Sequence, residues 1–207
     1  NPDREYELKD LDGHQIDTYA SIDPAFSTLE GRDYTGVVVV SIKRETDEWF
    51  FRYIKRERRN VRAMMDLIFE IWENYSHIGL RKIGIARTAF KDQVQPLFRE
   101  ECNKRRIYPS IGEIIEAGKN KEQKIEGALS GRAELGRLWF TKNATDDTEA
   151  LRYELYNFPA SKYDDLADAA ANISELIKRI GTGSLGIPVS QLQLVDYSSA
   201  RTKLTGI

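Results

Sequence analysis

The order of the apolar patterns along the chain limits its possible folds more than any other feature of the sequence. Three strand-like runs occur within the first 54 residues and are joined by short polar segments: Tyr19–Asp23, Tyr34–Ile42 and Trp49–Ile54. β-Branched and aromatic residues are frequent in these runs, and the second contains four consecutive valines at 37–40. Strands joined by such short connections predict an antiparallel meander.

Helical patterns alternate with short strands after this meander. Asn60 is the expected N-cap of a helix whose apolar residues recur at helical spacing as far as Gly79. Four further helices are predicted, over 90–106, 119–135, 148–156 and 162–180. Short strands are predicted between them, over 82–85, 108–115 and 137–140. A meander followed by alternating helices and strands predicts an α/β domain with a mixed sheet.

The sequence is expected to divide into three parts. A polar lead-in covers residues 1–18, one domain covers 19–180, and a tail rich in Gly, Ser and Gln covers 181–207. The tail opens with a literal G-x-G-x-x-G pattern, but this pattern follows a helix and runs into Pro188, so it is not a dinucleotide fingerprint. Because the first residue is Asn1 and not Met, we expect a piece of a longer polypeptide.

Composition excludes several classes of protein. The 31 Lys and Arg residues are balanced by 33 Asp and Glu residues, so any nucleic-acid site must be a local basic patch. The single cysteine excludes an intrachain disulfide and indicates a reducing compartment. No apolar run approaches the roughly 20 residues that span a membrane, so no membrane partner is expected.

Acidic residues follow the first strand and open the last helix. Asp23 closes its strand, where side chains of a buried sheet reach an open crevice. In the last helix, Asp165 lies at the edge of the apolar stripe, while Asp164 and Asp168 lean further toward solvent. Brought together, these carboxylates could hold Mg²⁺ or Mn²⁺, because such cations prefer oxygen ligands. Two such ions would activate a water molecule and stabilise the leaving oxygen of a phosphodiester.

Each acidic position also has a purely structural explanation. Asp23 immediately precedes Pro24, which fits an Asx-type turn at a strand exit. Ser161 and Asp164 fit a capping box that complements the helix dipole. That explanation does not account for three aspartates followed by the alanines at 169–171, which let the helix approach the sheet closely.

Four segments between Tyr19 and Ile180 form a further pattern. They are Ile22–Ala25 with Gly31–Thr35, Asn120–Ile125, Gly136–Phe140, and Phe158–Ala169, which ends in Asp-Asp-x-x-Asp-Ala. In this order they resemble the motifs of the nuclease domain of large terminase subunits of tailed bacteriophages. The resemblance implies an RNase H-like (RuvC-type) fold, in which an antiparallel meander opens a mixed sheet that helices flank on both faces.

The resemblance also implies an activity and its site. It is a metal-dependent endonuclease that cuts concatemeric double-stranded DNA during viral genome packaging, with two Mg²⁺ or Mn²⁺ ions. The matching metal ligands are Asp23 and Asp165, with Asp168 and Asp164 as the next candidates. Asp33 matches an acid near the first ligand and is expected to act without contacting metal. The helix that carries Lys121 and Lys124 matches the family's basic helix, and these lysines are the expected contacts to DNA phosphates.

The resemblance further implies partners and a location. The expected partners are the packaging ATPase domain of the same polypeptide, the portal protein and the small terminase subunit, in the cytoplasm of an infected bacterium. The ATPase needs a Gly-x-x-x-x-Gly-Lys-Ser/Thr loop, and this sequence contains none.

One departure from the family pattern concerns the fourth strand, where an acid usually follows Ile-Gly-Ile. This chain has Ala86 there, and a methyl group cannot ligate a metal. We interpret Ala86 as an inactivating substitution, natural or engineered. The alternative is that the register is different and another acid, such as Asp92, compensates.

Two other functions remain open at this stage. One is a non-catalytic RNase H-like module that binds DNA or the portal protein, which Ala86 makes conceivable. The other is a nuclease of the resolvase or transposase type. Metal-dependent cleavage separates the enzymes from the binding module.

Overall fold

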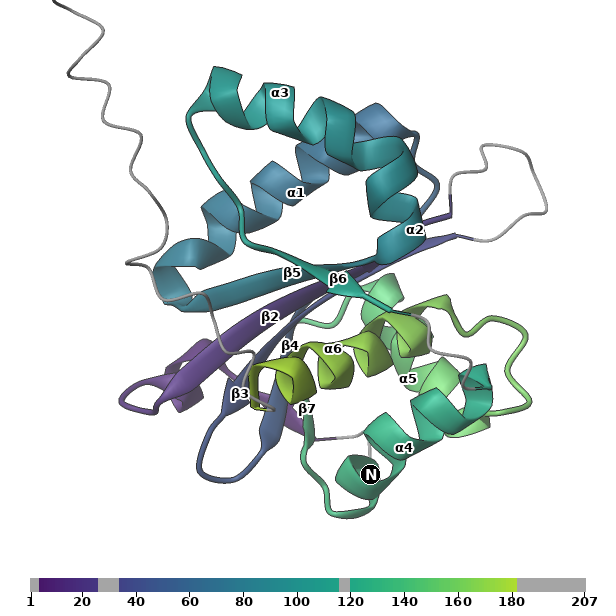
Figure 1. Cartoon of the computed structure of the whole chain (residues 1–207). Coiled ribbons are helices and arrows are strands. Elements are labelled where there is room, and N and C mark those ends of the chain that lie inside the picture. Colours follow the sequence, from purple (N-terminus) through teal and green to yellow (C-terminus); the bar gives the residue numbers. More distant parts are fainter. Residues whose placement is uncertain (1–3, 26–33, 116–119, 182–207) are drawn as a thin grey trace, which may run out of the picture. The chain divides into compact units, whose positions relative to one another are not determined.

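The computed structural model describes residues 4–25, 34–115 and 120–181, and within these ranges the side chains at 88, 92–93 and 178–181 are not described. One seven-stranded mixed sheet organises this part of the chain, with the strand order β1-β7-β4-β3-β2-β5-β6 (Figure 1). The chain divides into two units, residues 1–177 and 178–207, and the sheet lies in the first.

The strands are β1 Glu5–Tyr6, β2 Ile16–Asp23, β3 Thr35–Lys43, β4 Glu48–Glu57, β5 Leu80–Ala86, β6 Ile111–Ile114 and β7 Leu138–Thr141. The α-helices are α1 Val61–Tyr75, α2 Arg87–Ala89, α3 Gln95–Arg105, α4 Lys121–Glu134, α5 Asp146–Asn157 and α6 Asp165–Gly181. A π-helical turn, Phe90–Val94, joins α2 to α3. Two 3-10 segments cover Leu8–Leu11 and Ser76–Ile78.

Pairing in the sheet confirms the predicted meander and the mixed topology. β2 pairs with β3 and β3 with β4 in antiparallel fashion, whereas β5 joins β2, and β6 joins β5, in parallel fashion. β7 adds to β4 in parallel orientation on the other side. The carboxyl ends of β2, β4, β5 and β6 therefore lie at one edge of the sheet, next to the start of β3.

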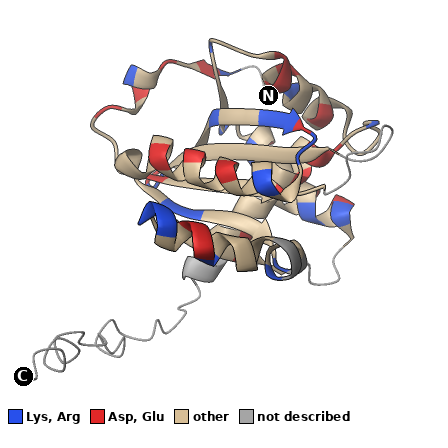
Figure 2. Cartoon of the chain, turned by 90° about the horizontal axis from the view of Figure 1, so that it is seen from above, with Lys and Arg blue, Asp and Glu red and all other residues tan. Residues whose placement is uncertain are grey.

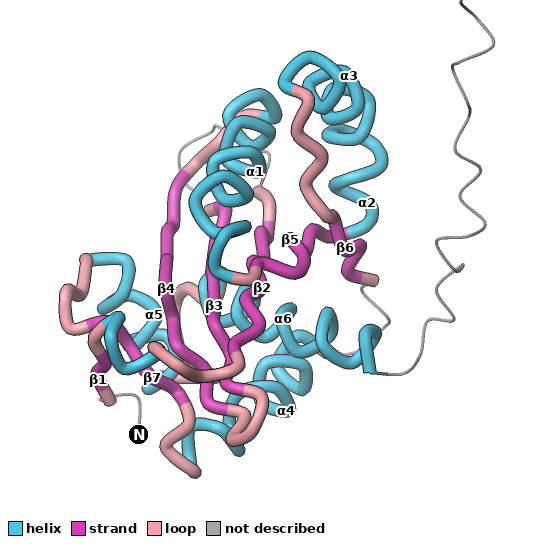
Figure 3. Tube along the Cα trace, turned by 90° about the vertical axis from the view of Figure 1, so that its left-hand side faces the viewer, coloured by secondary structure: helices cyan, strands magenta, loops and turns pink. Residues whose placement is uncertain are grey.

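Helices cover both faces of the sheet, as expected (Figures 1 and 3). On one face, Met64, Leu67, Ile68 and Ile71 of α1 pack with the π-turn against apolar residues of β2, β3 and β5. On the other face, residues of α4, α5 and α6 pack against apolar residues of β3, β4 and β7. Alternating side chains of the β3 valines serve the two cores in turn, because successive residues of a strand point to opposite faces.

Several element boundaries differ from the sequence predictions. The helix predicted over 90–106 begins at Arg87 and contains the π-turn, because Pro96 has no N–H to donate to the preceding turn. The strand predicted over 108–115 is limited to β6. The lead-in contributes β1, whose Tyr6 is buried and donates its hydroxyl to the carbonyl of Phe51 at 2.9 Å. The division of the chain at residues 19 and 180 stays a prediction.

The described helices carry both acidic and basic residues, as the near balance of charges in the sequence predicts. Figure 2 shows acidic and basic residues side by side on the helices. Among the described residues, no helix has both the length and the apolar character needed to cross a membrane.

Candidate active site

β2 and α6 bring the strand-end acid and the helix acids to the same place. Asp23, the last residue of β2, pairs in register with Gly36 of β3. A β-carbon at Gly36 would lie 2.5 Å from the carbonyl oxygen of Asp165. Only a residue without a side chain permits this approach. Gly36 therefore lets the first turn of α6 lie against β3, next to Asp23 on β2. The short alanine side chains of α6 are buried in the core on the same face of the sheet.

Side-chain alternation places the Asp23 carboxylate on the face covered by α6. Ile22 packs in the core beneath α1, so its neighbour Asp23 points to the opposite face. Asp165 and Asp168 are each only 8% exposed, which makes both of them buried acids. The expectation that Asp168 leans toward solvent was wrong, because lysines of α4 lie against it.

Charges surrounding Asp23 show that the acids interact. Burial, followed by the charges of Asp168 and Asp165, raises the pKa of Asp23 to about 7, while Lys121 and Lys124 lower it. When ionised, the three carboxylates carry one more charge than the two lysines, and a bound cation would supply the balance.

The lysines predicted as DNA contacts both lie against acids of α6. Lys121 donates to Asp164 at 2.7 Å, and its ammonium lies 3.9 Å from Asp168. Lys124 forms an ion pair with Asp168 and donates to Asn172 at 3.0 Å. Burial lowers the pKa of Lys121, but the neighbouring aspartates outweigh burial and raise it overall. A contact with DNA stays a prediction for both lysines.

Ala86 occupies the position next to Asp23 on the neighbouring strand. The register pairs Ile22 with Ile85, so the following residues, Asp23 and Ala86, are adjacent at the sheet edge. Ala86 is 6% exposed and contributes only a methyl group there. Glu113 of β6 does not replace the missing acid, because it pairs with Ile85 in the register and forms ion pairs with Arg87 and Lys91. Asp33 and the side chain of Asp92 lie outside the described residues.

The donor chemistry of this cluster fits a hard divalent cation, although no ready-made binding geometry is present. Three carboxylates, from Asp23, Asp165 and Asp168, interact in a partly buried position, and oxygen ligands are those that Mg²⁺ and Mn²⁺ prefer. Within the described ranges, no three acidic, histidine or cysteine side chains are already placed to hold an ion. Lysines of α4 pair with the acids of α6 instead, and Ala86 offers no ligand.

Sequence reasoning missed one buried acid beside the cluster. Glu154 of α5 is 1% exposed, accepts a hydrogen bond from the backbone N–H of Ala167 at 2.9 Å, and pairs with Arg56 at 3.1 Å. Burial raises the pKa of Glu154 to about 7, against the effects of these two donors. The signal in the sequence was its spacing, three residues after the buried Leu151 and therefore on the same helix face.

Glu154 makes the stability of the fold depend on pH. Its pKa is near 7 in the folded state and near 4.5 when unfolded, so the folded state binds more protons between these values. The free energy of unfolding therefore decreases as pH rises from about 4.5 through 7. We expect Glu154→Gln to reduce this decrease by about 2 kcal/mol, as measured by urea unfolding at pH 5 and pH 8. Parallel pH profiles for the two proteins would contradict this, and Glu149→Gln, on the exposed face of α5, is the control.

Arginines and tyrosines extend the site along the edge of the sheet. Arg56 of β4 pairs in register with Gly36, and its guanidinium lies 5.1 Å from the ring centre of Tyr163. Arg58 lies 4.4 Å from the ring centre of Tyr34. These two arginines belong to a basic run at residues 55–59, in which Arg56 lies two strands away from Asp23 in the sheet.

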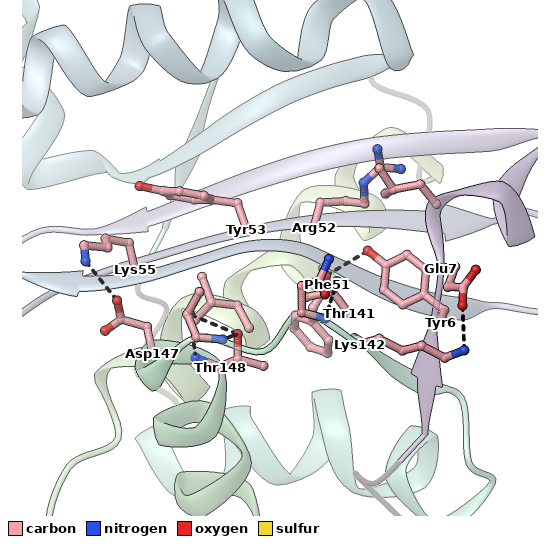
Figure 4. A pocket seen from close by; sticks show the side chains of 14 residues that line it. Tyr6, Glu7, Phe51, Arg52, Tyr53, Lys55, Thr141, Lys142, Asp147 and Thr148 are labelled. Atoms are coloured by element: carbon pink, nitrogen blue, oxygen red, sulfur yellow. Dashed lines mark hydrogen bonds and ion pairs between the residues drawn. The ribbon is translucent and has the colours of Figure 1, made fainter.

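A separate cavity of about 790 Å³ lies between β4, β7 and the start of α5 (Figure 4). Its basic side chains include Lys55, which donates to Asp147 at 3.1 Å, and Lys142, which donates to Glu7 at 2.7 Å. None of the three clustered carboxylates lines this cavity. The cavity is therefore separate from the candidate active site.

The fold is that of viral terminase nuclease domains. The human cytomegalovirus terminase nuclease domain matches with a TM-score of 0.61 at 17% identity, over 86% of this chain and 92% of that chain. A second structure of that domain, described as Mn soaked and inhibitor bound, gives 0.55 at 19% identity, over 86% and 91%. The P22 large terminase nuclease domain gives 0.52 at 12% identity, over 85% and 86%. These matches confirm the fold that the sequence resemblance implied.

Comparison by sequence alone gives no match. Neither a protein-family model nor a curated protein is similar to this chain. The similarity is thus one of three-dimensional arrangement.

Proposed function

We propose that this chain is the nuclease domain of a viral DNA-packaging terminase, and that it hydrolyses phosphodiester bonds of double-stranded DNA with divalent cations. The convergence of Asp23 with Asp165 and Asp168 at one edge of the sheet carries this proposal. It is supported by the fold shared with the terminase nuclease domains of human cytomegalovirus and P22.

Three side chains would hold the metal. Asp23 would contribute from the sheet, and Asp165 and Asp168 from the helix, with Asp164 further out beside Lys121. A bound Mg²⁺ or Mn²⁺ would polarise the phosphate and lower the pKa of an attacking water. Lys124 holds the Asp168 carboxylate. Ala86 leaves the set one carboxylate short, so cleavage by this chain is expected to be slow.

DNA would reach the site along the basic edge of the sheet. Arg56 and Arg58 lie there, and Lys121 is half-exposed at the other side of the carboxylates. Such contacts bind phosphates and carry no base information, so the cut would not depend strongly on sequence. The packaging ATPase domain, the portal protein, the small terminase subunit and the cytoplasm of the infected bacterium remain part of this proposal.

The second candidate function is a non-catalytic module that keeps the fold and binds DNA or the portal protein. The methyl group of Ala86, in the place of a ligand, is the observation that favours it.

Plasmid cleavage tests the proposal. We expect this chain to nick supercoiled plasmid slowly with Mn²⁺ or Mg²⁺ and not with EDTA, and Asp23→Asn to reduce nicking at least tenfold, because it removes the sheet-borne ligand. Asp17→Asn is the matched control, since Asp17 lies on the same strand but pairs with Arg44 and Arg81 at the opposite end. Calorimetry should show weaker Mn²⁺ binding for Asp23→Asn and unchanged Mn²⁺ binding for Asp17→Asn. Equal nicking by both variants, or nicking that survives EDTA, would refute the metal-dependent site.

A further inference from the structure

We infer that Glu154 is a positioning residue of the candidate active site: its carboxylate fixes the first turn of α6, and thereby sets Asp165 and Asp168 against Asp23. The effect of Glu154 on metal binding and cleavage rests on the proposed function. The structural part of the inference rests on the contacts of Glu154 alone.

The first contact is a helix cap supplied from another helix. Ala167 is the third residue of α6, and the N–H groups of a first helical turn have no acceptor within their own helix. Oε2 of Glu154 accepts the Ala167 N–H at 2.9 Å. The bond links residues 13 positions apart, so it ties α5 directly to the turn that carries Asp165 and Asp168. A carboxylate at a helix N-terminus is also favoured by the helix dipole.

The second contact ties the same carboxylate to the sheet. Oε1 of Glu154 pairs with Nη1 of Arg56 at 3.1 Å. Arg56 lies opposite Gly36 in the sheet, and Gly36 lies opposite Asp23 on its other side. Both oxygens of Glu154 thus have a partner. One accepts from the backbone of α6, and the other pairs with Arg56 of β4, the strand next to β3.

These contacts form a closed path through the site. From Asp23 the path runs through Gly36 to Arg56 by strand pairing, then through Glu154 to Ala167 by the ion pair and the cap. It returns at Asp165, whose carbonyl oxygen lies over Gly36. Because each link is a pairing in the sheet or a bond to a buried group, the first turn of α6 has little freedom to move relative to Asp23.

Glu154 reaches the candidate site through the backbone of α6. Glu154, Arg56 and Tyr163 line a groove of about 640 Å³ with residues of α5. One oxygen of the carboxylate accepts from the backbone of α6, and the other pairs with Arg56. Glu154 therefore acts through the helix and is not a further ligand.

Three variants in the full chain test the inference. Glu154→Ala removes both contacts, Glu154→Gln keeps an oxygen that can accept from Ala167, and Glu149→Ala is the control on the exposed face of α5. Two quantities are measured for each: the Mn²⁺ dissociation constant, and amide hydrogen exchange residue by residue. We expect Glu154→Ala to speed exchange at residues 166–168 about tenfold, as for the loss of a helix cap, and to weaken Mn²⁺ binding about tenfold. Glu154→Gln should stay within about twofold of the unaltered chain in both.

The outcomes separate positioning from ordinary stabilisation. A stabilising role alone would speed exchange throughout the sheet and leave the Mn²⁺ affinity of the folded protein unchanged, which would overturn the inference. If Glu154→Ala does not fold, exchange and Mn²⁺ affinity of Glu154→Gln decide, and a loss of both with the cap oxygen still present would also overturn it. If the unaltered chain binds no Mn²⁺, the proposed function loses its cofactor, while exchange confined to residues 166–168 still supports the positioning role.

Discussion

Replacing Ala86 with glutamate is expected to raise the rate of metal-dependent plasmid cleavage by about 100-fold, the size of effect seen when one electrostatic group of an active site is restored. Ala86 lies next to Asp23 at the edge of the sheet, on the strand that pairs with β2. A carboxylate there adds an oxygen ligand and a negative charge where the site has a methyl group.

The same substitution should make the protein's stability depend on metal. Without metal, another acid beside Asp23, whose pKa is already raised to about 7, lowers the melting temperature. With Mn²⁺ the loss is reversed, because ligand binding to the folded state stabilises it.

Ala86→Gln is the matched control for this experiment. It has nearly the same volume as Ala86→Glu but no negative charge, so it should lower stability without restoring cleavage. Plasmid nicking is compared for both variants in Mn²⁺, Mg²⁺ and EDTA. If Ala86→Glu cuts no faster than Ala86→Gln, the alanine does not mark a disabled metal site, and the binding-module function becomes the better explanation.

Gly36→Ala is expected to lower the free energy of unfolding by about 3 kcal/mol, as overpacking of a tight core contact does. The added methyl would lie 2.5 Å from the carbonyl oxygen of Asp165 and 2.9 Å from its carbonyl carbon, both backbone atoms that cannot rotate away. The first turn of α6 must then move from the sheet, so Mn²⁺ binding should weaken as well.

Gly127→Ala is the control, and its effect should have the opposite sign. Gly127 lies within α4, and a β-carbon there would meet nothing within 4 Å. Alanine in a helix is favoured over glycine by about 1 kcal/mol, so this variant should be more stable than the unaltered chain. Urea unfolding of both variants decides, and a Gly36→Ala protein as stable as its parent would show that α6 does not depend on this close approach.

Local patterns predicted the elements of the fold well, and long-range contacts explain what they missed. The valine-rich β3 and the amphipathic α6 follow from periodicity, because their apolar faces are continuous in the sequence. β1 was hidden because two residues carry too little pattern, and Tyr6 is recognisable as a core residue only when β7 lies beside it. Pro96 visibly lacks an N–H in the sequence, but whether this produces a π-turn before it depends on packing.

The acids of the candidate site were predictable from the sequence, whereas most of their side-chain contacts were not. Asp23 and Asp165 follow from strand-end and helix-edge positions, and the structure places them on one face. Lys124 was expected to face DNA, and only the packing of α4 on α6 reveals its pairing with Asp168. Glu154 was missed because an acid on a buried helix face is meaningful only through its partners, Arg56 and Ala167, which are distant in sequence.

The docking of α6 against β2 and β3 also determines when the site can exist during synthesis of the chain. Asp23 belongs to the first long strand, whereas Asp165 follows 142 positions later. A nascent chain on the ribosome can form the hairpins of the meander early, because their contacts are local, but the carboxylates cannot meet until the last described helix has been translated. A polypeptide that stops just before residue 165 would therefore contain all seven strands and none of the assembled acid cluster, so no cleavage could begin until α6 had been translated.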